Sequence, residues 1–203
     1  YATAMAADQQ PEIIDNLRQI TSLLQGARRP MVGVMGSGVE AHQPKSAHVG
    51  AWLASLGVHL LTGGGAGVMQ AVCQAFCGQP GRAGLSIGIL PAADSGTGRR
   101  APPGYPNPWE DIPVYTHLTG RGQSGGEPIS RNIINILSSD VIIALPGSWG
   151  TSSEVALAAR QGRPVIAYLN HPDEIPDIPA GVRVEAEWPQ VQQFVINALS
   201  SLE

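Results

Sequence analysis

The sequence predicts a single Rossmann-like α/β domain with a doubly wound, mostly parallel sheet and helices on both faces. Short runs of apolar residues alternate with segments of helical spacing along most of the 203 residues. Strands that are covered on both faces give such runs. Glycine clusters directly follow several of the runs, and parallel sheets bind ligands at the carboxyl ends of their strands. The length fits one domain over 1–203.

The first predicted element is a helix over 11–26, where Ile and Leu recur at helical spacing between Pro11 and Gly26. Residues 1–10 are expected to be flexible. The predicted strands that follow are 31–35, 58–62, 85–90, 141–145 and 164–169. The predicted helices between and after them are 44–56, 67–77, 129–138, 151–161 and 189–202. This order indicates repeated strand-helix-strand units.

One long segment, 91–128, interrupts the alternation. It is rich in Pro and Gly and contains at most one short strand, near 113–117. Long loops in compact domains are uncommon and often functional. We therefore expect this segment to cover a ligand or to contact another subunit, and a surface insertion is the alternative.

The charge balance limits the partners of the protein. The formal net charge is −4, and Lys45 is the only lysine beside eleven arginines. Nucleic-acid binding normally requires a basic surface, so this class is not expected. The N-terminal residues lack a basic region and a long apolar run, which predicts neither a signal peptide nor a membrane span. A cytoplasmic location is the expectation, and a bound anion would be held by Arg and backbone N–H groups.

The metal-ligating residue types form no recognisable site in the sequence. Cys73 and Cys77 share a face of a predicted helix without nearby histidines, and we interpret them as buried or free thiols. The five histidines are not spaced like ligands: His42, His48, His59, His117 and His171. We predict no metal bound by protein side chains.

The sequence TGGGAGVM, at 62–69, is typical of a strand followed by a glycine turn and a helix start, a geometry that binds anions. Val68 and Met69 stand where a Walker A loop requires Lys and Ser or Thr, so a P-loop is excluded. The dinucleotide fingerprint also fails, because Val68 and Gln70 occupy its last glycine position in either register. No NAD is therefore expected.

A second motif is more specific. Arg131 opens a predicted helix, and PGSWGTSSE follows at 146–154. This stretch resembles the P-G-G-x-G-T-x-x-E signature of the Lonely Guy superfamily, and TGGGAGVM is similar to its first glycine loop. The resemblance covers about residues 30–170. It implies that the Gly147–Thr151 N–H groups and the Thr151 hydroxyl bind a phosphate at a helix N-terminus, with Arg131 assisting. The alternatives are that Thr151 caps the helix and that Arg131 neutralises Asp140 or Glu154.

The enzymes of this superfamily use the matching Arg and Glu as a catalytic pair that cleaves a nucleoside 5′-monophosphate into free base and ribose 5-phosphate. On that resemblance, Arg131 and Glu154 are the candidate catalytic residues. Ser148 replaces the second glycine of the signature, and Asn132 stands where those enzymes usually have lysine. Some relatives are labelled lysine decarboxylases, but Lys45 lies without an accompanying motif, so no pyridoxal phosphate (PLP) is expected.

The stretches GYPNPWEDIPVYTHL and SRNIINILSSDVIIALPG look most like the molybdenum cofactor carrier branch of the superfamily. That branch binds molybdopterin, a pterin with one phosphate and a molybdenum held by dithiolene sulfurs. The resemblance implies a protein that protects and transfers this cofactor, as a homodimer or homotetramer, to molybdoenzymes or their maturation proteins. Trp109 and Trp149 are candidates to stack on the pterin, and a core or subunit contact is their alternative.

Two functions therefore remain: a carrier of the molybdenum cofactor, which is favoured, and a nucleotide-cleaving phosphoribohydrolase. Another phosphorylated ligand is the third possibility. The predicted ligand-binding residues gather at the ends of the predicted strands and the starts of the following helices. They are Gly36, Ser37, Thr62, Gly63, Gly64, Gly65, Gly67, Met69, Arg131, Asn132, Pro146, Gly147, Ser148, Trp149, Gly150, Thr151 and Glu154.

Overall fold

The computed structural model describes residues 28–93, 100–120 and 130–202. They form a sheet of seven strands in the order β4-β3-β2-β1-β5-β6-β7, and every pair of neighbours is parallel. The strands are β1 (Met31–Met35), β2 (His59–Thr62), β3 (Ser86–Leu90), β4 (Ile112–Tyr115), β5 (Val141–Ala144), β6 (Val165–Tyr168) and β7 (Arg183–Glu185). The predicted Rossmann-like fold is confirmed.

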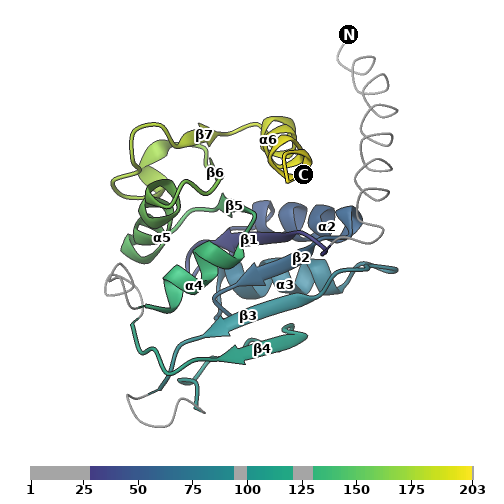
Figure 1. The fold of residues 1–203 in the computed structure, drawn as a ribbon, viewed down its shortest axis with the longest axis vertical. Helices are drawn as coiled ribbons and strands as arrows, with labels where there is room; N and C mark the ends of the chain where they lie inside the picture. Colours follow the sequence, from purple (N-terminus) through teal and green to yellow (C-terminus); the bar gives the residue numbers. More distant parts are fainter. Residues whose placement is uncertain (1–27, 94–99, 121–129, 203) are drawn as a thin grey trace.

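Helices cover both faces of the sheet (Figure 1). One face carries α2 (Lys45–Leu56), α3 (Val68–Cys77) and α6 (Trp188–Ser200). The other carries α4 (Arg131–Ser138) and α5 (Trp149–Arg160). A short 3-10 helix, η2 (Pro172–Glu174), follows β6. The central strands β1 and β5 are buried between these layers, which explains their continuous apolar sequences.

Most predicted elements are present with small shifts at their ends. Helix α5 begins at Trp149, two residues before its predicted start, and β4 confirms the short strand expected within 91–128. Strand β7 was not predicted, because Arg183–Glu185 is a short, partly exposed edge strand without an apolar run. The predicted helix 11–26 and the predicted flexibility of 1–10 lie outside the described residues.

The strand order fixes where a ligand can bind. From β1 the chain adds β2, β3 and β4 on one side, and then returns to place β5 on the other side of β1. The loops that follow β1 and β5 therefore leave the sheet in opposite directions and open a crevice between them. Both glycine-containing loops, at 36–38 and 146–150, lie at this carboxyl edge.

Close packing of α2 on α3 depends on Gly50. A Cβ at this position would overlap the carbonyl oxygen of Val72 and would lie 2.9 Å from the Cβ of Ala75. The absence of a side chain thus permits the two helices to approach. Phe76, which is fully buried beside this contact, then fills the core beneath it.

We predict that Gly50→Ala lowers the free energy of unfolding by about 1–3 kcal/mol, the usual cost of overpacking. Helix propensity alone predicts the opposite sign, a gain of about 1 kcal/mol. Urea denaturation followed by circular dichroism measures the difference. A variant more stable than the wild type would contradict this account of the α2–α3 contact.

Candidate functional site

A cavity of about 130 Å³ lies at the carboxyl edge of the sheet, at the crevice beside β1. Its walls come from the loop after β1, the first turns of α3, α4 and α5, and the segment that precedes β4. The lining residues are Gly36, Gly38, Met69, Tyr105, Arg131, Asn132, Ser148, Gly150, Thr151 and Glu154. Residues far apart in the sequence therefore meet at one place, as the two glycine motifs predicted.

Eight of the predicted residues line this cavity: Gly36, Met69, Arg131, Asn132, Ser148, Gly150, Thr151 and Glu154. The others stand behind the walls or beside them: Ser37, Thr62, Gly63, Gly64, Gly65, Gly67, Pro146, Gly147 and Trp149. Direct ligand contact by this second set stays a prediction. Gly38 and Tyr105 line the cavity although the sequence analysis did not select them.

Arg131 occupies the first position of α4, and its side chain is buried, with 5% of the residue exposed. Its Nη1 donates to the carbonyl oxygens of Gly63, at 3.1 Å, and Ile89, at 3.0 Å. The guanidinium also lies 5.8 Å from the centre of the Tyr105 ring. These contacts fix the cation between the ends of β2 and β3, so that it faces the cavity.

Neither Asp140 nor Glu154 forms a direct ion pair with Arg131 among the described residues. Asp140 accepts a hydrogen bond from Arg28 Nη1 at 2.9 Å and one from the Met31 N–H at 2.8 Å, so its carboxylate is already satisfied. Among the described residues no ion pair joins Arg131 to Glu154. Arg131 thus has no direct carboxylate partner among these residues, although its charge acts on nearby Glu154.

Glu154 faces the same cavity from the second turn of α5 and is 8% exposed. Burial raises the pKa of its carboxyl from 4.5 to about 7, and the nearby charge of Arg131 only partly opposes this rise. Near neutral pH the group therefore exchanges a proton readily. The protonated carboxyl can donate a hydrogen bond or a proton to a ligand, or it can form an uncharged part of the cavity wall.

Several buried polar atoms around the cavity lack a hydrogen-bond partner within the described part of the chain. They are Arg131 Nε, Asn132 Oδ1, and both Oδ1 and Nδ2 of Asn135. A buried polar atom without a partner costs about 1–3 kcal/mol. Such a concentration of unpaired donors and acceptors beside one cavity is typical of a site that a polar ligand completes.

The N-terminus of α5 forms part of the cavity wall, where Ser148, Gly150 and Thr151 line it. Ser148 is the N-cap residue and makes no side-chain cap hydrogen bond, and no acidic residue lies in the first turn. The partial positive charge of the helix end therefore remains available to an anion. Thr151 is 3% exposed and lies beyond the cap position, so the alternative that Thr151 caps the helix is wrong.

Gly147 has a different role from the predicted one. Its N–H donates to the Glu174 carbonyl oxygen at 3.0 Å and is not directed at a ligand. A Cβ at this position would overlap Thr151 Oγ1. The glycine thus permits the Thr151 side chain to pack under the loop, and in this structure the Gly147 N–H is used within the protein.

The TGGGAG loop supports the cavity walls from behind. Gly63 gives its carbonyl to Arg131, and Gly67, at φ +63°, permits the Val68 N–H to donate to the Ser37 carbonyl at 2.9 Å. A Cβ at Gly65 would lie 2.8 Å from Met69 Cε and 3.0 Å from the Tyr105 ring. These glycines bring two wall residues and the guanidinium close together.

The aromatic side chain in the cavity wall is Tyr105, and neither predicted tryptophan lines the cavity. Trp149 is 50% exposed and Trp109 is 36% exposed. Tyr105 lies in the stretch GYPNPWE, which resembles the carrier branch, and this was the one indication of its role in the sequence. No periodicity in that stretch predicts which of its aromatic residues lines the cavity.

Cys73 is buried and Cys77 half-buried, and both are free thiols, as predicted. Burial raises the pKa of the Cys73 thiol, which makes it a poor nucleophile. In the described ranges no three His, Cys, Asp or Glu side chains gather as a metal site would require. No described helix is long and apolar enough to cross a membrane.

Comparison with known proteins gives one family and several related structures. The model of the SLOG cluster4 family matches residues 29–191, a range that includes every lining residue of the cavity. An uncharacterized protein of Archaeoglobus fulgidus is 31% identical over 136 residues, 66% of this chain and 76% of that protein. These matches confirm the predicted Lonely Guy-like family.

Two solved structures cover 86% of this chain. The molybdenum cofactor binding protein of the phototrophic bacterium Rippkaea orientalis is 32% identical, with a TM-score of 0.65 over 99% of its length. The molybdenum cofactor carrier protein of Chlamydomonas reinhardtii is 28% identical, with a TM-score of 0.60 over 100% of its length. Both are similar to this chain over nearly their whole fold.

The raised pKa of Glu154 predicts a pH-dependent stability. Between pH 4.5 and about 7 the folded state retains the proton that the unfolded state loses, so the stability of the wild type falls as the pH rises. At about 1.4 kcal/mol per pH unit, this interval corresponds to roughly 3 kcal/mol. The Glu154→Gln variant has no carboxyl at this position, so its stability does not decrease in this way as the pH rises.

Denaturation of both proteins from pH 4 to 8 therefore gives a stability difference that grows in favour of Glu154→Gln as the pH rises. Glu187→Gln is the matched control, since Glu187 lies exposed on the surface. Parallel pH profiles for wild type and Glu154→Gln would refute a protonated Glu154.

Proposed function

The chain belongs to the SLOG cluster4 family, and from that premise we propose that it binds the molybdenum cofactor as a carrier, with the phosphate of the pterin in the cavity. The observation that carries the proposal is the buried Arg131 guanidinium opposite the free N-terminus of α5. The two structural relatives, one a molybdenum cofactor binding protein and one a molybdenum cofactor carrier protein, support the choice of cargo.

The residues of the cavity fit a phosphorylated pterin. Arg131 and the α5 N-terminus suit a phosphate group, and a hydrogen bond to a charged group contributes about 1.5–3 kcal/mol. Asn132 lines the cavity, and its unpaired Oδ1 can accept a hydrogen bond from a polar heterocycle, while the Tyr105 ring offers a flat apolar face. When bound, the cofactor brings its own dithiolene ligands for molybdenum, so no protein ligand to the metal is needed.

The cavity holds only part of such a cargo. Sites for whole ligands of this size usually enclose about 300–1,000 Å³, whereas this cavity measures about 130 Å³. We place the phosphate inside and the remainder along the adjoining surface. Release to an acceptor, a molybdoenzyme or one of its maturation proteins, would then need no unfolding of the site.

A phosphoribohydrolase is the second candidate, because Arg131 and Glu154 line the same cavity and the pKa of Glu154 is about 7. That value suits a general acid or base near neutral pH. Ser148 and Asn132 also line the cavity and differ from the residues usual in the enzymes, which favours the carrier.

We predict that Arg131→Lys weakens binding of the molybdenum cofactor about tenfold to a hundredfold, because lysine keeps the charge but loses the planar fork that is fixed on Gly63 and Ile89. Equilibrium titration with cofactor released from a molybdoenzyme under anaerobic conditions measures the affinity. Arg160→Lys is the matched control at the far end of α5.

The same preparations separate the two functions. The carrier proposal expects the wild type to slow the oxidation of the cofactor and to release no free base from adenosine monophosphate. Rapid base release that is abolished in Glu154→Gln would overturn the carrier and support the enzyme.

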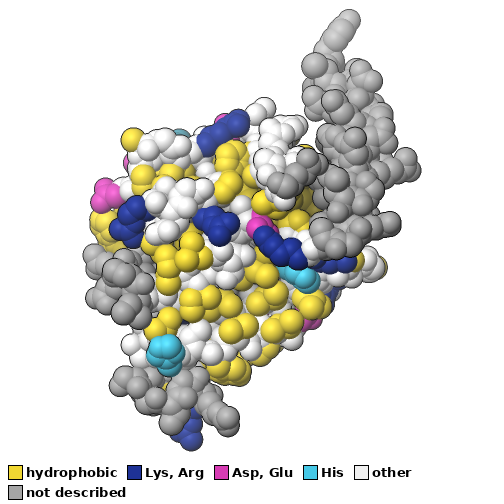
Figure 2. Space-filling model, in the orientation of Figure 1, with side chains coloured by type: hydrophobic (Ala, Val, Ile, Leu, Met, Phe, Trp, Pro, Cys, Tyr) yellow, Lys and Arg dark blue, Asp and Glu magenta, His cyan; other side chains and the backbone are white. Residues whose placement is uncertain are grey.

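We further propose a cytoplasmic location, because both cysteines are free thiols. We also propose that the protein assembles as a homo-oligomer. An apolar patch supports the assembly: Figure 2 shows hydrophobic side chains gathered over α4 and the β3–β4 side of the sheet. Ile112 and Val114 pair in register with Ile87 and Ile89, which face the α4–α5 layer, and they stay 41% and 38% exposed. A patch of this kind on a face is suited to a two-fold contact.

Leu137 belongs to α4, one of the elements over which this patch extends, and it is 45% exposed. We predict that Leu137→Asp reduces the particle mass measured by light scattering after size exclusion. Leu202→Asp is the control, since Leu202 is equally exposed at the end of the chain after α6. An unchanged mass for Leu137→Asp, or a monomeric wild type, would contradict the assembly through this face.

A further inference from the structure

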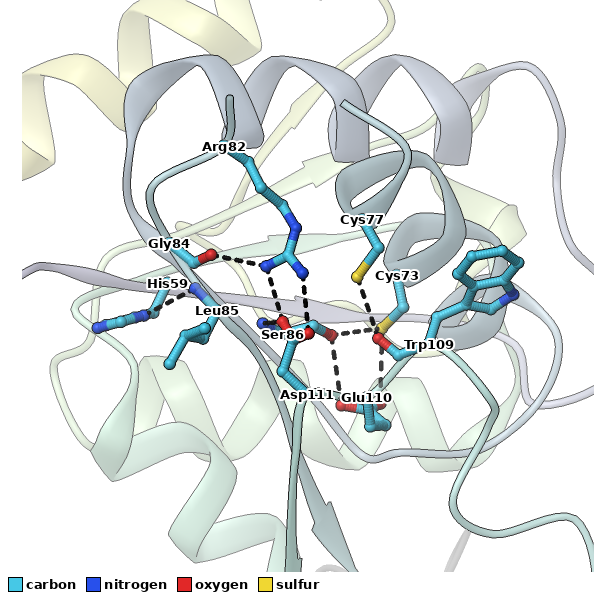
Figure 3. Close-up of polar contacts among 10 residues, drawn as sticks. All are labelled: His59, Cys73, Cys77, Arg82, Gly84, Leu85, Ser86, Trp109, Glu110 and Asp111. Carbon is cyan, nitrogen blue, oxygen red and sulfur yellow. Dashed lines mark hydrogen bonds and ion pairs between the residues drawn. The ribbon is translucent and has the colours of Figure 1, made fainter. Parts of the chain in front are cut away.

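The carboxylate of Glu110 is half-buried and surrounded by hydrogen-bond donors, and Figure 3 shows two of them, Ser86 and Cys73. It comes from the segment before β4, and its partners come from β2, β3, α3 and its own segment. The donors are Asn107 Nδ2 at 2.8 Å, Thr62 Oγ1 at 3.0 Å, Ser86 Oγ at 3.3 Å and Cys73 Sγ at 3.5 Å.

All four partners of this carboxylate are neutral. Arg82, the cation of this region, is engaged by the neighbouring Asp111 at 2.7 and 2.8 Å (Figure 3). Burial raises the pKa of Glu110, and the hydrogen bonds partly offset the rise. The strand beneath is shaped for the group, since a Cβ at Gly88 would lie 2.7 Å from Glu110 Cδ. An apolar side chain would fill this space at lower cost in desolvation.

Two of the four donors are also bound to the glycine loop. Thr62 Oγ1 donates to Glu110 and accepts from the Gly64 N–H at 2.9 Å. The Asn107 amide donates to Glu110 and to the Gly65 carbonyl at 3.2 Å, and the Asn107 backbone N–H donates to the Gly64 carbonyl at 2.8 Å. The carboxylate therefore orients both groups that hold the loop.

The loop in turn supports the cavity. The ring of Tyr105, two residues before Asn107, packs against Gly65 and lines the cavity. Arg131 is attached to the same loop through the Gly63 carbonyl, but it has an independent second acceptor, the Ile89 carbonyl. Loosening the loop would thus displace Tyr105 more than Arg131.

We propose that Glu110 is a positioning residue for the cavity, which acts through Thr62 and Asn107 to hold the glycine loop and the Tyr105 wall in the geometry that binds the heterocyclic part of the cargo. This inference rests on the proposed carrier function. It assigns Glu110 no contact with the ligand. A residue that only stabilises the fold would affect the binding of all ligands, whereas Glu110 is expected to affect the binding of the cofactor more than that of phosphate.

The test compares the affinities of full-length wild type and Glu110→Gln for two probes, the anaerobic molybdenum cofactor and inorganic phosphate. Glutamine has the same shape and can keep a carbonyl oxygen where Thr62 and Asn107 donate, but it removes the negative charge that strengthens both hydrogen bonds and turns an NH₂ group toward the Ser86 hydroxyl. The cofactor affinity is expected to fall about tenfold, the effect of losing one good hydrogen bond. The phosphate affinity is expected to change less than about threefold, because Arg131 keeps the Ile89 carbonyl.

A double-mutant cycle with Tyr105→Ala adds a second readout. If Glu110 acts through the Tyr105 wall, the two losses in cofactor affinity are not additive, and Glu110→Gln has little further effect once the ring is removed. Asp111→Asn is the matched control on the adjacent carboxylate, which binds Arg82 at the surface and should leave both affinities unchanged.

The outcomes are distinct. A wild type that binds neither probe rejects the proposed function. If the wild type binds both probes, two results for Glu110→Gln overturn the positioning role. One is an unchanged affinity for the cofactor, and the other is an equal loss of affinity for both probes. If Glu110→Gln fails to fold, as judged by circular dichroism, Thr62→Val removes one arm of the network and carries the same expectation for the two probes.

Discussion

The buried guanidinium of Arg131 is the contact on which the site depends. It joins α4 to the ends of β2 and β3 through two backbone carbonyls, and it supplies the fixed positive charge of the cavity. A buried cation is costly unless it is well hydrogen-bonded or meets an anion. Nε lacks a partner, and no direct ion pair joins the guanidinium to Glu154 in the described chain, an arrangement that suits an anionic ligand.

The glycine-rich loops divide their work around this cation. Ser148, Gly150 and Thr151, at the start of α5, line the cavity, while the TGGGAG loop holds Arg131, Met69 and Tyr105 from behind. Glycine is needed in the loop at 146–150 because Thr151 packs beneath Gly147, and in the TGGGAG loop because backbones approach closely at Gly67. Two similar sequence patterns thus serve different physical ends, one to bind and one to place the residues that bind.

The sequence predicted what local pattern encodes. Continuous apolar runs identified the central strands, and the spacing between Arg131 and the PGSWGT motif located the α4–α5 wall. Tyr105 and Glu110 could not be found in this way, because they lie in a Pro/Gly-rich segment whose order comes from tertiary hydrogen bonds to Gly64 and Gly65. The hydrogen bond from the Gly147 N–H to the Glu174 carbonyl could not be predicted either, because Glu174 lies in a separate segment that is distant from the motif in the sequence. Edge strand β7 was missed because polar residues dominate it.

The electrostatics of the cavity also bear on why a chain with both Arg131 and Glu154 would hold its ligand without cleaving it. A carboxyl with a pKa of about 7 beside a bound phosphate is pushed further toward its neutral form, because like charges disfavour ionisation. A neutral Glu154 cannot stabilise positive charge that develops on a ribose. It can instead donate a hydrogen bond to a polar cargo, while the unpaired Oδ1 of Asn132 accepts one. The binding of an anion and the protonation of Glu154 therefore reinforce each other, which favours retention of the ligand.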